Sequence, residues 1–217
     1  MASSTRRRGR PPLVTSARIA DAALSLPPGQ WSIAAVAEGV GVSETAVYRQ
    51  AANSEELLVL VVDHVVGNDL EPPPRRPGVD AVAYLDEVAR HVRSVLRGSS
   101  GVASAIVTTG WLGSTDHLDL FIERCLAELS QLGFSDVDGD AALNLLLNWT
   151  VRWVASEELG ASDFDAESEN HTDPIVTPRL ARAREQDMGV ETLFERHLRA
   201  LAAGIVAEFG SGVDEQR

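Results

Sequence analysis

The stretch VAEGVGVSETAVYR, residues 36–49, decides the fold of this chain. Apolar residues at 33, 36, 37 and 40 recur with helical spacing, Gly41 ends that helix, and Ser43 can cap the next helix directly. Two short helices joined by such a tight turn are typical of a helix-turn-helix unit. In such a unit the second helix enters the major groove of DNA, and its first residues reach the base edges.

Helical spacing continues on both sides of this unit, without a convincing strand alternation. A first helix is expected after Thr15 or Ser16, ended by Pro27-Pro28-Gly29, and a fourth over 54–66, capped by Asn53 or Ser54. Residues 67–78, with four prolines, form the clearest break. Further helices are expected over 79–97, 102–112, 115–132, 138–160, 178–187 and 189–209.

The composition is that of an ordinary globular chain. Its 217 residues, 44% hydrophobic and 24% charged, can form one or two domains. One cysteine excludes an intramolecular disulfide and a cysteine-built zinc site, and the apolar runs are too short to span a membrane. The basic N-terminus has no apolar stretch behind it that could form a signal peptide. We therefore expect a cytoplasmic protein with no membrane partner.

The net charge of −13 argues against a nucleic-acid partner when it is taken as an average. Its distribution is uneven: residues 1–18 have a charge of +5, residues 19–66 of −5, and residues 67–217 of −13. Most of the acid therefore belongs to the C-terminal part, and the N-terminus is a concentrated basic arm.

The arm contains four arginines, Arg6, Arg7, Arg8 and Arg10. An extended Arg-Gly-Arg segment followed by two prolines is narrow enough to lie in the minor groove, where A·T tracts deepen the negative potential. Most basic N-termini are simply solvated tails, and this is the alternative interpretation.

The third helix provides the other candidate DNA contacts, because Val42, Ala46 and Val47 must face the neighbouring helices. The exposed positions are then Glu44, Thr45, Tyr48, Arg49 and Gln50, with the hydroxyls of the caps Ser32 and Ser43 as phosphate donors. Gln50 could read adenine if it reached the groove floor. The alternative is a small three-helix bundle that binds no DNA, since loose helix-turn-helix patterns recur by chance.

Several stretches in order resemble the DNA-binding domain of the tetracycline-repressor (TetR) family. They are RIADAA (18–23), VAEGVGVS (36–43), AVYR (46–49), and LL (57–58) after Asn53. The body, with QLGFS at 131–135, resembles the ligand-binding half more loosely. The resemblance implies an all-α fold with a flexible basic arm (1–14), a three-helix helix-turn-helix DNA-binding domain (15–66) and a larger helical ligand-binding and dimerisation domain (79–210).

The resemblance also implies partners and shows two departures. It implies a homodimer on a double-stranded DNA operator, formed through the eighth and last helices, with the third helices in successive major grooves. The chain has Ser54 where the family commonly has lysine, and Gln50 where a histidine or aromatic residue is common. Because these changes leave the head short of cations, the arm is expected to supply more of the affinity than usual.

The body offers candidate contacts for an unknown small-molecule effector. Asn144, Asn148 and Arg152 recur every four residues, flanked by Trp149. Facing inward, this row offers amide donors and acceptors to a ligand, and facing outward it is a solvated edge. The helix that contains it is apolar on nearly every side, which predicts cover by a partner subunit.

By resemblance, further residues border a ligand cavity, although the tryptophans can equally belong to the core. These residues are His91, Thr108, Thr109, Trp111 and Leu112. The tetracycline repressor uses histidines with a divalent ion in this region, but IVTTGWL (106–112) has none. Neither that metal site nor tetracycline specificity is expected.

Enzymatic patterns are weak in this sequence. The five histidines show no metal-binding pair spacing, and Gly98-Ser99-Ser100-Gly101 is not a nucleophile elbow. Cys125 is expected to be a packed apolar residue and not a redox sensor. We expect no enzyme, no cofactor and no metal.

The expected function is a ligand-responsive transcriptional regulator, more specifically a repressor released from its operator by a small molecule. The alternative is a helical dimer that binds a small molecule or a protein and has a degenerate helix-turn-helix that no longer binds DNA. The net charge of −5 over residues 19–66 motivates that alternative.

Overall fold

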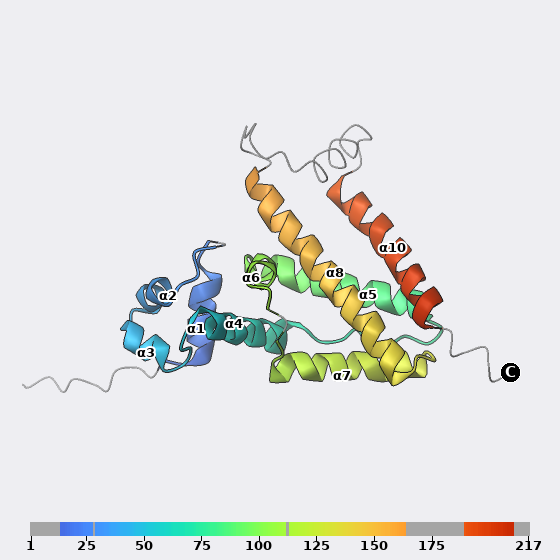
Figure 1. Ribbon diagram of the computed structural model, residues 1–217, viewed down its shortest axis with the longest axis horizontal. Helices are drawn as coiled ribbons and strands as arrows, with labels where there is room; N and C mark the ends of the chain where they lie inside the picture. Colours follow the sequence, from blue (N-terminus) through green and yellow to red (C-terminus); the bar gives the residue numbers. More distant parts are fainter. Residues whose placement is uncertain (1–13, 28, 112, 164–188, 211–217) are drawn as a thin grey trace, which may run out of the picture.

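The computed structural model describes residues 14–27, 29–111, 113–163 and 189–210, and these ranges contain helices and no strands (Figure 1). The helices are α1 (Ser16–Leu24), α2 (Ile33–Val40), α3 (Glu44–Tyr48), α4 (Ser54–Asp69), α5 (Ala81–Gly98), α6 (Val102–Thr109), α7 (Asp116–Gln131), α8 (Asp136–Asp163) and α10 (Val190–Phe209). The predicted all-α class is confirmed. No described helix is long and apolar enough to cross a membrane.

Helices α1 to α3 form a small head with the first half of α4. Thr15, Ser32 and Asn53 cap α1, α2 and α4, because each side chain accepts a hydrogen bond from a backbone N–H of the first turn. Ile19 and Val47 are fully buried between the helices. The apolar spacing of the sequence therefore closes a core that also includes Ala20, Ala23, Val36, Ala37, Leu57 and Leu58.

Helix α4 extends from the head into the body (Figure 1) and is longer than the sequence indicated. It continues to Asp69, past the expected end at 66, so the expected break at Gly67 lies inside the helix. A Cβ on Gly67 would lie 2.9 Å from the imidazole of His117, which explains why a residue without a side chain stands here. The segment without helix is 70–80.

The body consists of α5, α6, α7, α8 and α10, with the long helices α8 and α10 packed on each other and on α5 (Figure 1). Trp149 stacks on Phe194 with ring centroids 5.5 Å apart, and Trp153 lies edge-on to Phe194 at 5.6 Å. Helix α6 packs on α8 and α4, and α7 packs on the same two helices. Helix α4 therefore contacts the body through two separate elements.

The C-terminal end of α6 and the N-terminal end of α8 also differ from the sequence expectation, and one expected helix cannot be compared. The helix expected over 102–112 ends at Thr109, because Gly110 takes a left-handed φ of 66° that stops it, so Trp111 follows the helix. The helix expected from 138 begins at Asp136, where Ser135 accepts a hydrogen bond from the backbone N–H of Asp138 at 3.1 Å. The helix expected over 178–187 lies outside the described residues.

Candidate nucleic-acid interface and ligand cavity

Helices α2 and α3 have the geometry of a helix-turn-helix. Ser32 accepts a hydrogen bond from the N–H of Ala35 at 3.1 Å, and α2 ends at Gly41, whose φ of 76° is the left-handed conformation that favours glycine. The turn leads directly to Ser43, the N-cap of α3. The Ser43 hydroxyl makes no capping hydrogen bond, so it is available to an external acceptor.

The outer face of α3 is the predicted one. Val47 is fully buried, and Val42 and Ala46 are half-buried against the head. The remaining side chains of this segment are exposed, namely Glu44, Thr45, Tyr48, Arg49 and Gln50. Tyr48 is 49% exposed although it is aromatic.

Gln50 is placed differently from the other four side chains. Its Oε1 accepts a hydrogen bond from the Ser16 hydroxyl at 3.2 Å, so Gln50 contacts the N-terminus of α1. Its role in DNA binding stays a prediction.

The folded head is acidic. Residues 14–66 contain two arginines, Arg18 and Arg49, against six carboxylates. At the start of α4, the Glu56 carboxylate accepts a hydrogen bond from the Ala52 N–H at 2.7 Å, and Asn53 accepts one from the Glu56 N–H at 2.9 Å. The cationic candidates Arg6, Arg7, Arg8 and Arg10 lie outside the described residues, and their role in DNA binding stays a prediction.

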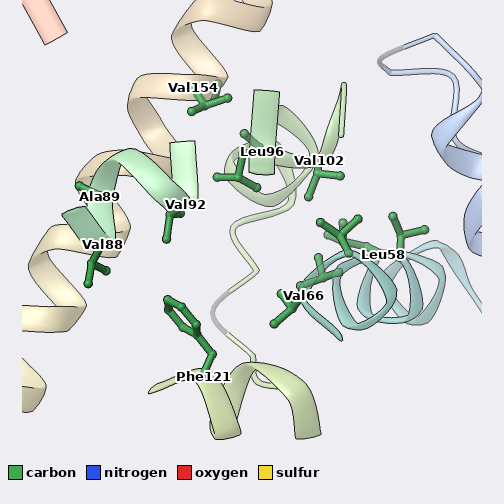
Figure 2. Packing of buried hydrophobic residues seen from close by; sticks show 14 of the residues in the cluster. Leu58, Val66, Val88, Ala89, Val92, Leu96, Val102, Phe121 and Val154 are labelled. Atoms are coloured by element: carbon green, nitrogen blue, oxygen red, sulfur yellow. The ribbon is translucent and has the colours of Figure 1, made fainter. Parts of the chain in front are cut away.

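A partly open cavity of about 500 Å³ lies between α4, α5, α6, α7 and α8. Its volume is in the range of small-molecule sites. Most of its wall is aliphatic or aromatic, with Val62, Val65 and Val66 contributed by α4. Figure 2 shows Val66, Val92 and Phe121 directed toward the space between their three helices.

One wall of the cavity is polar. Asp140, Asn144 and Asn148 follow each other at four-residue intervals on α8 and all line the cavity. The amide nitrogen of Asn148 donates to both the backbone carbonyl and the side-chain oxygen of Asn144, each at 3.0 Å. Arg152, the next residue at this interval, is exposed and does not line the cavity, so the row found in the sequence divides between cavity and solvent.

The structure brings together only some of the predicted ligand contacts. Trp111, Asn144 and Asn148 line the cavity, whereas His91, Thr108, Thr109 and Trp149 do not, and Leu112 lies outside the described residues. Thr109 donates its hydroxyl to the backbone of α6 at 2.8 Å. Trp149 packs in the aromatic cluster between α8 and α10.

Sequence reasoning missed Asp140 and the α4 side of the cavity. Asp140 lies four residues before Asn144, so the same helical spacing could have extended the row to it. The valines of α4 have no such signal, because an apolar residue that lines a cavity and one that fills a core look alike in a sequence.

The junction of head and body contains two imidazole–carboxylate pairs on α4. His64 Nε2 lies 3.0 Å from Asp21 of α1, and Asp63 lies 3.0 Å from His117 Nδ1 of α7. Partial burial alone raises the pKa of Asp63, but hydrogen bonds from Thr115 and His117 outweigh it and hold that pKa below its ordinary value. Both contacts border a cleft of about 630 Å³.

Metal binding and thiol reactivity are two further kinds of chemistry to consider. Among the residues described, no group of three or more histidine, cysteine, aspartate or glutamate side chains could hold a metal ion. Cys125 is completely buried, and burial raises the pKa of its thiol to about 12. A thiol with so high a pKa is a poor nucleophile.

A head with helix-turn-helix geometry, joined by one helix to a larger helical body with a partly open cavity, defines a two-domain all-α class of protein. No protein-family model matches the sequence, and a comparison with curated proteins finds no match. Solved structures do match over most of the chain.

Apo ActR from Streptomyces coelicolor is 21% identical, with a TM-score of 0.68 over 91% of this chain and 97% of ActR. A TetR variant from Acinetobacter baumannii AYE in complex with minocycline is 18% identical, with a TM-score of 0.69 over 90% of this chain and 98% of that one. BioQ from Mycobacterium smegmatis is 18% identical, with a TM-score of 0.65 over 89% and 98%. The chain therefore has the TetR-family fold.

Proposed function

We propose that this chain is a ligand-responsive DNA-binding transcriptional regulator, a repressor that a small molecule releases from its operator in the cytoplasm. The observation that supports this proposal most directly is that α4 both packs on the head and lines the cavity. Leu57 and Leu58 belong to the buried core where α4 packs on α1, and Val62, Val65 and Val66 of the same helix line the cavity. A ligand that displaces this wall acts on the helix that holds the head.

The proposed DNA contacts begin with the outer face of α3. Thr45, Tyr48 and Arg49 are exposed together and can donate to phosphates and base edges, and the free Ser43 hydroxyl adds a phosphate donor. Glu44 can accept a hydrogen bond from cytosine N4 in the major groove. The arm arginines supply the positive charge that the folded head lacks.

The proposed assembly is a homodimer formed through α8 and α10. Leu145 of α8 is 44% exposed and Val190 at the start of α10 is 50% exposed, although both are apolar. Gly204 of α10 has open space where a Cβ would lie, so a partner helix could approach closely there. Two subunits joined in this way present two heads, as an operator with twofold symmetry requires.

The matched structures support a ligand for the cavity. ActR has been solved with actinorhodin, and the Acinetobacter TetR variant with minocycline. We propose that the cavity of this chain binds a small molecule and no metal, with Asn144, Asn148 and Trp111 among the contacts. A coupling free energy of roughly 1–3 kcal/mol between cavity and DNA suffices for a useful switch, and DNA must weaken ligand binding by the same factor.

A gel-shift titration against the intergenic DNA upstream of the chain's own gene tests the proposal. The full chain should shift this DNA at low salt. Replacing Arg6, Arg7, Arg8 and Arg10 by glutamine keeps the length of the arm, and it should flatten the slope of log K against log salt by about three to four units per subunit. An unchanged slope would contradict the proposed role of the arm.

The second candidate function is a ligand-binding helical dimer without DNA binding. The observation that favours it is the excess of six carboxylates over two arginines in residues 14–66. Under this alternative, the full chain gives no shift with any fragment, even at low salt, while it still forms a dimer.

A further inference from the structure

The polar wall of the cavity indicates which chemistry its ligand has. We propose that the cavity selects an elongated apolar or aromatic molecule with a positively charged, N–H-bearing group that pairs with Asp140, and that it discriminates against anions. This inference rests on the proposed ligand-binding role of the cavity and adds the charge and polarity of the ligand.

Asp140 adds a carboxylate to the wall of the cavity. Of the residues that line the cavity within the described ranges, it is the one with an ionisable side chain. Its side chain is exposed to solvent and forms no hydrogen bond or ion pair with any described residue, although nearby helices contain many such pairs. An unpaired, solvent-exposed carboxylate at the edge of a largely apolar cavity is available to a ligand cation, and it repels a ligand carboxylate.

Asn144 and Asn148 determine which hydrogen-bonding groups α8 offers to a ligand. The Asn148 atom that contacts the carbonyl of Asn144 must be the amide nitrogen, because a carbonyl only accepts hydrogen bonds. Asn148 therefore offers its Oδ1 as an acceptor, and Asn144 offers its own NH₂ group as a donor. The row presents an acceptor at each end with a donor between them, which favours a ligand rich in N–H groups.

The geometry of the row sets the shape of the ligand. Four residues of an α-helix rise about 6 Å, so Asp140 and Asn148 lie about 12 Å apart along α8. The opposite wall is apolar, with Val66, Leu96 and Phe121. A molecule that satisfies both walls has one long apolar face and polar groups along one edge.

Three acridines that share one ring system and differ in charge test this inference. At neutral pH, 9-aminoacridine is a cation, acridine is neutral and acridine-9-carboxylate is an anion. Calorimetric titration of the full chain without DNA should show that the cation binds at least fivefold more tightly than the anion. Because the site is open to solvent, this preference should shrink as salt is added.

Two substitutions in α8 test whether Asp140 causes the preference for the cation. Asp140→Asn should weaken binding of 9-aminoacridine about threefold to fivefold and leave neutral acridine unchanged. Asp136→Asn is the matched control, since Asp136 is exposed on the same helix, as Asp140 is, but does not line the cavity. It should leave all three affinities within twofold.

Several outcomes overturn the inference. They are equal or tighter binding of the anion, equal effects of the two variants, or no binding of any acridine at millimolar concentration. None of these titrations contains DNA, so a failure here leaves the gel-shift result intact. Conversely, a chain that shifts no DNA but prefers the cation through Asp140 contradicts the regulator proposal and supports this one.

Discussion

Single residues of the body show how burial controls chemistry. Cys125 of α7 has no exposed surface, and transferring a thiolate from water into such a site is unfavourable. This is why the pKa of its thiol is raised to about 12. The sequence interpretation of Cys125 as a packed apolar residue agrees with this placement.

The Cys125 thiol should be inert in the folded chain. Incubation with a chromogenic disulfide reagent at pH 8 should release no colour over an hour, whereas the same chain in guanidinium should release one equivalent within minutes. The reason is that the thiolate forms only when Cys125 reaches solvent. Rapid reaction of the native chain would contradict the burial of Cys125.

At the scale of elements, ionic contacts connect helices that are distant in sequence. Arg93 of α5 is only 6% exposed, lies 4.0 Å from the ring centre of Phe194, and pairs with Glu157 of α8 and Glu191 of α10 at 2.6 Å each. One guanidinium therefore joins three helices, two of which belong to the proposed dimer face. A planar side chain with five donors suits such a position.

Removing this guanidinium should destabilise the body strongly. Arg93→Met leaves the Glu157 carboxylate, which is 15% exposed, without its shortest ion-pair partner, and should lower the free energy of unfolding by about 3–5 kcal/mol. Chemical denaturation followed by circular dichroism measures this loss. The control Arg124→Met removes an exposed arginine of α7 and should cost less than about 0.5 kcal/mol. Equal effects of the two substitutions would refute the role of Arg93.

The Asp63–His117 contact between α4 and α7 should make stability depend on acid. The pKa of Asp63 is lower when folded than when unfolded, so the carboxylate stabilises the fold above about pH 4, and this contribution disappears as the pH falls through the folded pKa. The wild-type chain should therefore exceed Asp63→Asn in unfolding free energy at pH 6, and the difference should decrease as the pH is lowered toward 2.5.

The control for Asp63 is Asp69→Asn. Asp69 is an exposed residue at the end of the same helix. It should change stability by less than about 0.5 kcal/mol at either pH. A difference between wild type and Asp63→Asn that stayed constant from pH 6 to 2.5 would show that the carboxylate charge is not involved.

At the scale of the whole molecule, the proposed dimer interface can be tested at one exposed apolar residue, Leu145. Leu145 of α8 and Leu120 of α7 are almost equally exposed, at 44% and 43%, but only Leu145 belongs to the proposed interface. Leu145→Glu should convert a dimer into a monomer in sedimentation experiments, and Leu120→Glu should not. A monomeric wild-type chain, or equal behaviour of both variants, would contradict the proposed interface.

The sequence predicted the head better than the cavity, and the reason is the range of the contacts. Capping by Ser32, the turn at Gly41 and the burial of Val47 depend on residues a few positions apart, so helical spacing determines them. The cavity depends on contacts between five helices distant in the chain. Its polar wall was visible as a periodic row on α8, whereas its border at Trp111 was assigned to a helix that Gly110 ends.

The end of the fourth helix was also predicted wrongly because it depends on a contact between residues distant in the chain. Gly67 reads as a helix breaker in the sequence, but in the structure it lies inside α4, where His117, fifty residues later, occupies the space that a side chain would fill. Only the tertiary contact explains this glycine. The consequence is large, since it makes α4 a continuous connection between head and cavity.

Recognition of specific DNA sequences by α3 is tested most directly by selection from a pool of random duplexes. The full chain should enrich an inverted repeat, as two symmetry-related heads require. Replacing Thr45 and Arg49 together by alanine should abolish the enrichment, while Arg124→Ala on the body should leave it unchanged. Recovery by the wild-type chain of an unenriched pool, indistinguishable from that of the α3 variant, would contradict the account.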